Sequence, residues 1–253
     1  MNTSITHGAS EPRFGFTRPA HFGQFPRPLE RRIQFPFPPT SQDMTPEEIL
    51  QSRRLVPVIE ITDVAQALPL AEALVQGGLP VAEVTFRSAA APESIKRMCT
   101  VPGLCVGAGT IINVDQARQA LDCGAQYFVS PGLFPKVVAF ALENKIPIYP
   151  GVATPTDIGT ALDLGVNVLK FFPAEALGGL KTLKAFSAPF PQVKFVPTGG
   201  INEANLASYL AHPKVVACGG SWMVEKSLLA AGRFDEVARL VAAAVALAAA
   251  PAK

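Results

Sequence analysis

Short apolar segments rich in β-branched residues alternate with amphipathic segments from residue 55 onward, at intervals of roughly 20 to 25 residues. The apolar segments predict buried strands, and the segments between them predict helices that begin at Asn or Asp and end at Gly. Strands that alternate with helices pair in parallel through right-handed crossovers, so the pattern predicts an α/β fold, a single (β/α)₈ TIM barrel. The predicted strands are 55–61, 81–86, 105–111, 127–132, 147–152, 168–174, 194–200 and 215–221.

An open, doubly wound sheet is the alternative fold for the same alternation of strands and helices. That fold marks its dinucleotide site with a GxGxxG turn after the first strand, and no such motif opens a helix at that place here. The closed barrel is therefore the preferred interpretation.

The first 43 residues lack this pattern. Phe and Pro recur in FGF, FPRP and FPFPP, five arginines appear, and no helical or strand period persists. We predict a disordered N-terminal extension over 1–43 and one barrel domain over 44–253. An organellar transit peptide is an alternative, although the prolines oppose the amphipathic helix that such peptides need. An extended or misassigned start upstream of Met44 would also explain the segment.

Composition and charge point to small-molecule chemistry. The 253 residues are 49% apolar and 17% charged, enough for a full core, and no apolar run is long enough to span a bilayer, so no membrane partner is expected. The net charge is only +2 and the basic residues are dispersed, which argues against a nucleic acid partner. Four cysteines without CxxC spacing predict buried, reduced thiols and a cytoplasmic protein. They are Cys99, Cys105, Cys123 and Cys218.

One lysine interrupts an apolar strand near the end where barrels carry their sites. Lys170 lies in VLKFFPA, and Val168 and Phe172 share its face of the strand. If that face points into the barrel, burial disfavours the ammonium and leaves an amine that can attack a carbonyl. A lysine that reaches to solvent or pairs with Glu175 is the alternative. The other lysines fall in predicted helices or loops, or begin a strand in the case of Lys194.

A second polar set lies in VAEVTFR, where Glu83, Thr85 and Arg87 share one face of the strand. The functional interpretation makes Glu83 a general acid/base and Arg87 a clamp for a substrate carboxylate, with Arg87 also keeping Glu83 ionised. A purely structural ion pair between the two is the alternative.

Glycine-rich turns end the seventh and eighth predicted strands, as PTGG at 197–200 and CGGS at 218–221. Barrels frequently bind phosphate at these two positions, because glycine lets backbone N–H groups approach an anion, although tight turns need glycine too. The histidines, His7, His21 and His212, lie in the N-terminal segment or in a predicted loop, so we expect neither a catalytic triad nor a metal site.

Together these motifs resemble the family of aldolases that act on 2-keto-3-deoxy-6-phosphogluconate (KDPG) and 4-hydroxy-2-oxoglutarate (KHG). The resemblance runs from about Leu55 to Trp222, and KFFPAE at 170–175 together with EVTFR at 83–87 is its most specific part. The other matching motifs are VPVI, VGAGT, SPG, PTGG and GGSW.

The resemblance implies a class I (Schiff-base) aldolase that cleaves KDPG to pyruvate and glyceraldehyde 3-phosphate, and KHG to pyruvate and glyoxylate as a second activity. Its partners would be a 2-keto acid and a sugar phosphate, it would need no cofactor, and family members imply a homotrimer. Lys170 would form the Schiff base and Glu83 would shuttle protons. The implied binding residues are Arg87 and Thr110 at the pyruvyl carboxylate, Pro131 and Phe172 as pocket walls, and Thr198, Gly199, Gly200, Gly220 and Ser221 toward the phosphate.

Three alternatives remain open at this point. An aldolase for the galactonate-derived epimer (KDPGal) differs from the first expectation by one hydroxyl configuration, which a motif does not rank. A sugar-phosphate epimerase or isomerase barrel would use the same glycine turns and leave Lys170 idle. A catalytically silent binding module predicts the loss of a key side chain, whereas Lys170, Glu83 and Arg87 are all present.

Overall fold

Parallel strands form the interior of the molecule. The computed structural model describes Met1 and residues 44–249. The strands β5, β4, β3, β2, β1 and β9 pair side by side in that order, β6, β7 and β8 form a second ladder, and every pairing is parallel. The strands are β1 Leu55–Ile59, β2 Val81–Thr85, β3 Cys105–Gly109, β4 Tyr127–Val129, β5 Ile148–Tyr149, β6 Gly151–Val152, β7 Val168–Phe171, β8 Lys194–Pro197 and β9 Cys218–Gly220.

The sheet is curled, and its two ladders meet at two places. Only Pro150 separates β5 from β6, and proline has no N–H to donate to a strand ladder. On the other side, isolated parallel bridges join Phe195 to Val215 and Thr198 to Gly219. The first strand pairs with the last, because β1 runs beside β9. The result is an α/β fold built on a curled parallel sheet.

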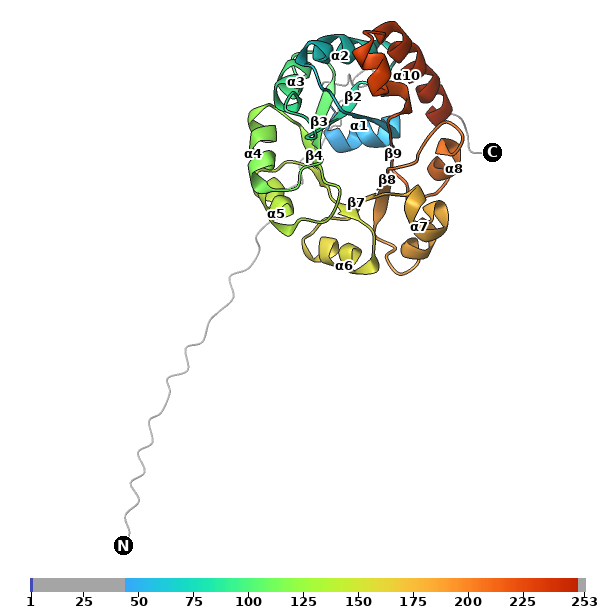
Figure 1. The fold of residues 1–253 in the computed structure, drawn as a ribbon. Coiled ribbons are helices and arrows are strands. Elements are labelled where there is room, and N and C mark those ends of the chain that lie inside the picture. The colour runs from blue at the N-terminus through green and yellow to red at the C-terminus, as the bar shows by residue number, and fades with distance from the viewer. Residues whose placement is uncertain (2–43, 250–253) are drawn as a thin grey trace, which may run out of the picture. The chain divides into compact units, whose positions relative to one another are not determined.

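Helices surround the strands, as Figure 1 shows. This arrangement is expected for parallel strands, since each crossover returns the chain through a helix on the outer face of the sheet. The α-helices are α1 Pro46–Arg53, α2 Ala67–Gln76, α3 Ala91–Met98, α4 Val114–Asp122, α5 Pro135–Glu143, α6 Pro155–Asp163, α7 Gly179–Ser187, α8 Leu206–Leu210, α9 Lys226–Ala230 and α10 Phe234–Ala249. The short 3₁₀ helices are η1 Val64–Gln66, η2 Glu175–Leu177 and η3 Trp222–Val224.

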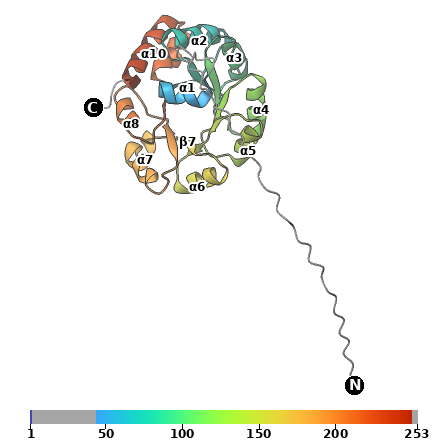
Figure 2. The ribbon, with the colours of Figure 1, turned by 180° about the vertical axis from the view of Figure 1, so that it is seen from behind.

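Helix α1 lies across the strands instead of joining the outer ring (Figure 2). Thr45 caps it in a full capping box with Glu48, and Pro46 occupies the first turn. Its apolar residues Ile49 and Leu50 are buried, and Leu50 borders the same small interior cavity as Lys170. The helix therefore closes the interior of the sheet from one side.

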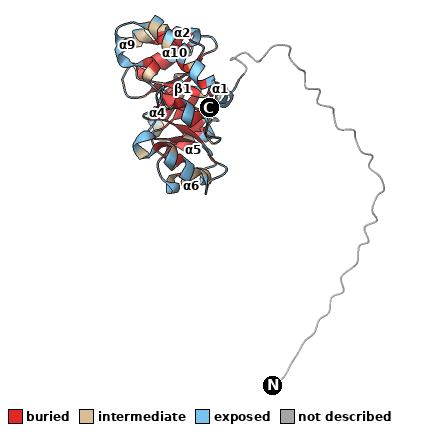
Figure 3. Cartoon of the chain, turned by 90° about the vertical axis from the view of Figure 1, so that its right-hand side faces the viewer, coloured by how far each residue is buried: buried red, intermediate tan, exposed pale blue. Residues whose placement is uncertain are grey.

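Burial follows the layers: the strands and the inward faces of the helices are buried, and the outer helix faces are exposed (Figure 3). The largest fully buried side chains include Tyr127, Phe128, Phe171 and Phe195, all from strands. Among the described residues, no helix is long and apolar enough to cross a membrane.

The predicted strands begin at the observed residue in six of eight cases, and all but the fifth extend past the observed C-terminal end. The fifth predicted strand is interrupted at Pro150, and the pairing of the eighth starts at Cys218, with an isolated bridge at Val215 before it. The overextended residues belong to the loops that follow each strand. The prediction of disorder over 1–43 falls, apart from Met1, outside the described residues.

Candidate active site

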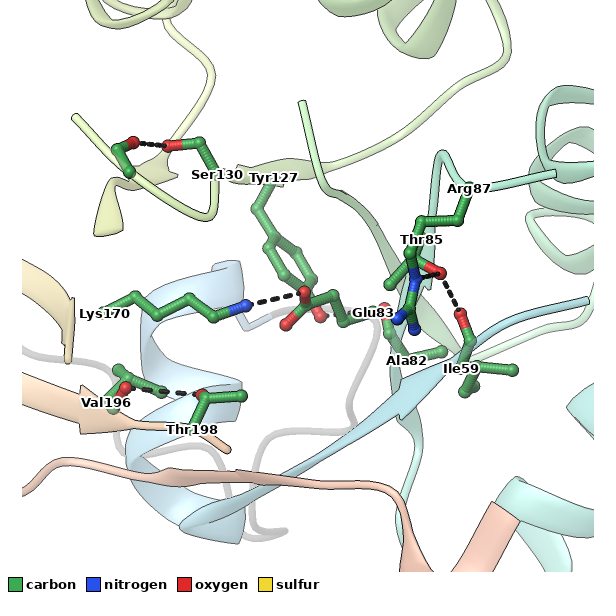
Figure 4. Close-up of polar contacts among 11 residues, drawn as sticks. Ile59, Ala82, Glu83, Thr85, Arg87, Tyr127, Ser130, Lys170, Val196 and Thr198 are labelled. Atoms are coloured by element: carbon green, nitrogen blue, oxygen red, sulfur yellow. Dashed lines mark hydrogen bonds and ion pairs between the residues drawn. The ribbon is translucent and has the colours of Figure 1, made fainter. Parts of the chain in front are cut away.

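The amine of Lys170 and the carboxylate of Glu83 meet in the interior of the sheet. Lys170 Nζ lies 3.1 Å from Glu83 Oε1, as Figure 4 shows. Lys170 is 5% exposed and Glu83 is 3% exposed, so the pair is almost fully withdrawn from water. A charged group buried in this way requires a partner, and each of these residues is the other's partner.

Strand register brings the two residues together from opposite parts of the chain. Glu83 is the third residue of β2, and it pairs with Val58 of β1 and Gly107 of β3. Lys170 is the third residue of β7, beside Gly151 of β6 and Val196 of β8. Side chains alternate along a strand, so Lys170 points inward while the next residue, Phe171, points outward and stacks edge-on against Phe186 of α7.

Both structural alternatives for Lys170 are wrong. Its side chain does not reach solvent, and its partner is Glu83. Glu175 instead accepts a hydrogen bond from the hydroxyl of Tyr209. The ring of Phe172 lies 5.2 Å from Lys170 Nζ, close enough for a cation–π contact.

Arg87 lies just beyond β2, and its partner also differs from the sequence-based expectation. Its Nε contacts Glu60 Oε2 at 3.2 Å and donates to Thr85 Oγ1 at 3.1 Å. Glu83 contacts Lys170 and Arg87 contacts Glu60, so the alternative of a structural ion pair between Arg87 and Glu83 is wrong. The side chain of Arg87 is 49% exposed and remains accessible to a ligand.

The other candidate residues for the pyruvyl end follow the C-terminal ends of strands. Thr110 comes directly after β3 and has a φ of 59°, a left-handed conformation that is costly for a β-branched residue and is concentrated at functional sites. Pro131 follows β4, and its carbonyl oxygen lies so close to Gly151 that a Cβ built there would be 2.3 Å away. The loop after β4 therefore lies directly against β6.

The candidate residues for the phosphate end also lie close to one another. Gly199 and Gly200 follow β8 with φ values of 95° and 83°, which glycine adopts at no steric cost. Gly220 ends β9, Ser221 follows it, and the bridge between Thr198 and Gly219 links the two turns. Ser221 is exposed, and its hydroxyl is available to a ligand.

The sequence does not reveal two contacts at the site, one between Tyr127 and Ala82 and one between Glu60 and Arg87. The hydroxyl of Tyr127 donates to the carbonyl of Ala82, next to Glu83, at 2.8 Å, and burial raises the pKa of this phenol, which stays neutral. Glu60 does not appear in the sequence-based set, although it directly follows the apolar strand β1. That position is the signal that could have identified it.

The titratable groups outside the site are consistent with structural roles. All four cysteines are free thiols, but the prediction that all are buried is wrong for Cys99 and Cys123, which are partly exposed. Burial raises the pKa of Cys99 to about 11 and that of Cys105 to about 12, which keeps both protonated. His212 accepts the backbone N–H of Lys214 on Nδ1 at 3.2 Å, and burial followed by Lys184 and Lys214 lowers its pKa.

A buried amine in contact with a buried carboxylate, with a guanidinium and glycine turns at the same strand ends, is an arrangement that can support covalent chemistry between a lysine and a carbonyl compound. The family model for "KDPG and KHG aldolase" matches residues 47–240. The chain belongs to this family of aldolases.

Individual relatives agree with the family model. The 2-dehydro-3-deoxy-phosphogluconate aldolase of Treponema pallidum is 49% identical over 196 residues, which cover 76% of this chain and 92% of that protein. The crystal structure of the KDPG aldolase of Zymomonas mobilis ZM4 with 3-phosphoglycerate aligns with a TM-score of 0.75 and 43% identity, over 79% of this chain and 94% of that one. The KDPG aldolase of Legionella pneumophila, with pyruvate captured as a covalent carbinolamine, aligns with a TM-score of 0.76 and 39% identity, over 79% of this chain and 98% of that one.

Proposed function

We propose that this protein is a class I aldolase that cleaves KDPG to pyruvate and glyceraldehyde 3-phosphate. The observation that carries the proposal is the 3.1 Å contact between Lys170 Nζ and Glu83 Oε1 in a site almost closed to water. An amine in such a place has a base at hand to take its proton, which is what a nucleophilic lysine requires. The covalent pyruvate in the Legionella pneumophila relative supports the same chemistry.

In the proposed mechanism, covalent attachment comes first. Lys170 passes a proton to Glu83, and the neutral amine attacks the C2 ketone of the substrate to give a carbinolamine. Glu83 returns the proton to the departing hydroxyl, which leaves as water. The product is an iminium ion, which draws electrons toward C2.

Cleavage and release follow from the same two residues. Glu83, now ionised, takes the proton of the C4 hydroxyl while the C3–C4 bond breaks, and its electrons pass into the iminium to give an enamine. Glyceraldehyde 3-phosphate departs. Glu83 then protonates C3 of the enamine, and water hydrolyses the resulting iminium to release pyruvate and restore the Lys170 amine. Proton transfer of this kind contributes about 10²- to 10⁴-fold to the rate.

The ends of the substrate match the two polar ends of the site. We assign the pyruvyl carboxylate to Arg87 and Thr110, because a guanidinium binds a carboxylate through two parallel N–H groups. Pro131 and Phe172 would line the pocket between them. The phosphate would meet Ser221, Thr198 and the backbone of the glycine turns, whose members are Gly199, Gly200 and Gly220.

KHG is a second candidate substrate, because the family is described by both substrates. It shares the 2-keto acid end with KDPG and lacks the phosphate. An exposed hydroxyl at Ser221 and two positive-φ glycines beside Thr198 favour the phosphorylated substrate. An epimerase or isomerase that leaves Lys170 idle does not account for the buried contact of its amine with Glu83.

The closure of the barrel, the oligomeric state and the cellular location are also part of the proposal. We infer that β5 and β6 form one strand and that the bridges between the segments of β8 and β9 complete a closed (β/α)₈ barrel over the described residues 44–249. We also propose a homotrimer, which light scattering during gel filtration would test. The four free thiols support the cytoplasm as its location.

The proposal is tested by supplying KDPG, KDPGal and KHG separately and following pyruvate release in a coupled assay. We expect the largest kcat/KM for KDPG. A larger kcat/KM for KDPGal or KHG would show that KDPG is not the preferred substrate. No release of pyruvate from any of the three would contradict aldolase activity.

A further inference from the structure

Glu60 lies at the centre of a group of charges beside the proposed carboxylate end of the site. It directly follows β1, its side chain is only 15% exposed, and each of its carboxylate oxygens contacts a different cation. Oε2 is 3.2 Å from Arg87 Nε, and Oε1 is 2.6 Å from Lys226 Nζ. A side chain with this little exposure and two cationic partners has few alternative conformations.

The contacts of Arg87 are confined to one edge of its guanidinium. Nε meets both Glu60 Oε2 and Thr85 Oγ1, and Thr85 is itself fixed by donating to the carbonyl of Ile59 at 2.8 Å (Figure 4). Within residues 44–249, no hydrogen bond or ion pair occupies the two Nη groups of Arg87. Because those groups form the other edge of the guanidinium, they remain available to bind a carboxylate.

We propose that Glu60 is a positioning residue for Arg87: it holds the guanidinium by Nε and so aims the Nη groups at the substrate carboxylate. The proposal rests on the proposed function, in which Arg87 binds that carboxylate. A long, half-exposed arginine loses conformational freedom when it binds a ligand, and an ion pair already made in the free protein removes part of that cost. The ion pair of Glu60 with Arg87 therefore strengthens substrate binding and leaves the chemistry at Lys170 unchanged.

Lys226 has a distinct part in this arrangement. A carboxylate next to the binding arginine would repel the carboxylate of the substrate, and the ammonium of Lys226 offsets that charge. The trio of Glu60, Arg87 and Lys226 therefore keeps one net positive charge. Lys226 also begins α9, shortly after Ser221, so the ion pairs connect the segment after β9 to the segments after β1 and β2.

A purely structural ion pair makes different predictions from a positioning residue. If Glu60 only ties α9 to the sheet, its removal lowers stability and affects kcat and KM without regard to Arg87. If Glu60 positions Arg87, its removal raises KM for the 2-keto acid, and the effect disappears when Arg87 is absent. The dependence on Arg87 separates the two.

The test compares Glu60→Ala and Glu60→Gln in the wild-type chain and in Arg87→Ala, by steady-state kinetics on KDPG and by the pyruvate concentration needed for half-maximal borohydride trapping. Because this ion pair joins a half-exposed guanidinium to a largely buried carboxylate, we expect Glu60→Ala to raise both concentrations about threefold to fivefold, with kcat changed less than about twofold. Glu60→Gln should recover part of the loss, because its amide oxygen keeps a polar partner beside Nε although the opposite charge is gone. In Arg87→Ala, the Glu60 substitutions should change KM less than about twofold.

Glu93→Ala is the matched control, because Glu93 forms an exposed ion pair with Arg97 at 3.1 Å on α3. It should leave KM unchanged. Thermal unfolding of each variant shows whether it folds, and Glu60→Gln serves if the alanine variant does not. An unchanged KM in Glu60→Gln and Glu60→Ala, or an equal rise in the Arg87→Ala background, would overturn the positioning role. Failure of the wild-type protein to be trapped at all would instead contradict the proposed function.

Discussion

Gly109 of β3 lies directly against the carboxylate of Glu83 on β2. A Cβ built on Gly109 would come within 2.4 Å of Glu83 Oε1 and 2.7 Å of its Cγ. Real Cβ atoms do not approach other atoms so closely, so any side chain at this position displaces Glu83. Glycine at 109 therefore leaves the space in which Glu83 meets Lys170.

Gly109→Ala should reduce activity far more than stability. The displaced atoms belong to a flexible side chain, so the fold accommodates the change, but the carboxylate moves away from Lys170. Misplacement of a catalytic group by about 1 Å costs on the order of 10²-fold in rate, and we expect a kcat reduced by about that factor. Steady-state kinetics together with thermal unfolding would measure both effects.

Gly159→Ala is the control for this substitution. Gly159 lies within α6, and a Cβ there meets nothing within 4 Å. We expect full activity and a gain of about 0.5–1 kcal/mol, because alanine favours the helix over glycine. If both variants lose activity equally, contact with Glu83 is not the cause.

A second prediction concerns the cost of burying the pair of Lys170 and Glu83. Lys170→Met removes the cation and leaves a carboxylate that is 3% exposed without its partner. Breaking a buried pair in this way costs about 3–5 kcal/mol, whereas replacing both members with apolar residues is often neutral or stabilising. The double variant Lys170→Met/Glu83→Leu should therefore be more stable in urea than Lys170→Met alone. Equal stabilities would show that the pair is not coupled in the folded state.

The sequence predicts the positions of the strands and the residues that share a face with Lys170, because both follow from local alternation of side chains. It does not predict which carboxylate meets that lysine. Glu83 and Lys170 are 87 residues apart, and only the register of β2 and β7 in the curled sheet brings them together. Long-range pairing of this kind leaves no local signal.

The contact partner of Arg87 is likewise not predictable from the sequence. The pattern predicts that Glu83, Thr85 and Arg87 share one face of a strand, but β2 ends at Thr85 and Arg87 lies beyond it. The actual partner of Arg87 is Glu60, because β1 runs parallel beside β2 and its C-terminal end lies at the same edge of the sheet.

The interruption of the fifth predicted strand at Pro150, in contrast, has a local cause that the sequence itself contains, because proline has no N–H to donate to the strand ladder.

A third prediction concerns pH and follows from the buried thiols. Burial raises the pKa of Cys99 from 9.0 to about 11, whereas an unfolded thiol keeps its ordinary value. The folded state therefore binds the proton more tightly, and the stability that this contributes is complete below pH 9.0 and is lost as the pH rises toward about 11. Urea unfolding over this range should show a falling midpoint. Cys99→Ser should reduce the slope without abolishing it, since the pKa of Cys105 is raised as well, to about 12. A slope unchanged by Cys99→Ser would contradict this origin.

A fourth prediction addresses the phosphate end of the site. Ser221→Ala removes an exposed hydroxyl after β9. A hydrogen bond to a charged group is worth about 1.5–3 kcal/mol, so we expect kcat/KM for KDPG to fall by about tenfold or more. The same variant should change kcat/KM for KHG, which has no phosphate, by less than about twofold. Equal losses on the two substrates would place the phosphate elsewhere.

The central claim is that Lys170 forms the covalent bond to the substrate, and borohydride reduction in the presence of pyruvate tests it most directly. Lys194→Ala is the matched control, because Lys194 also lies in a strand but at the exposed start of β8. Intact-mass analysis should show one reduced pyruvate per chain in the wild-type protein and in Lys194→Ala, and none in Lys170→Ala. Peptide mapping should locate the modification at Lys170. An adduct that persists in Lys170→Ala, or the absence of any adduct in the wild-type protein, would contradict the claim.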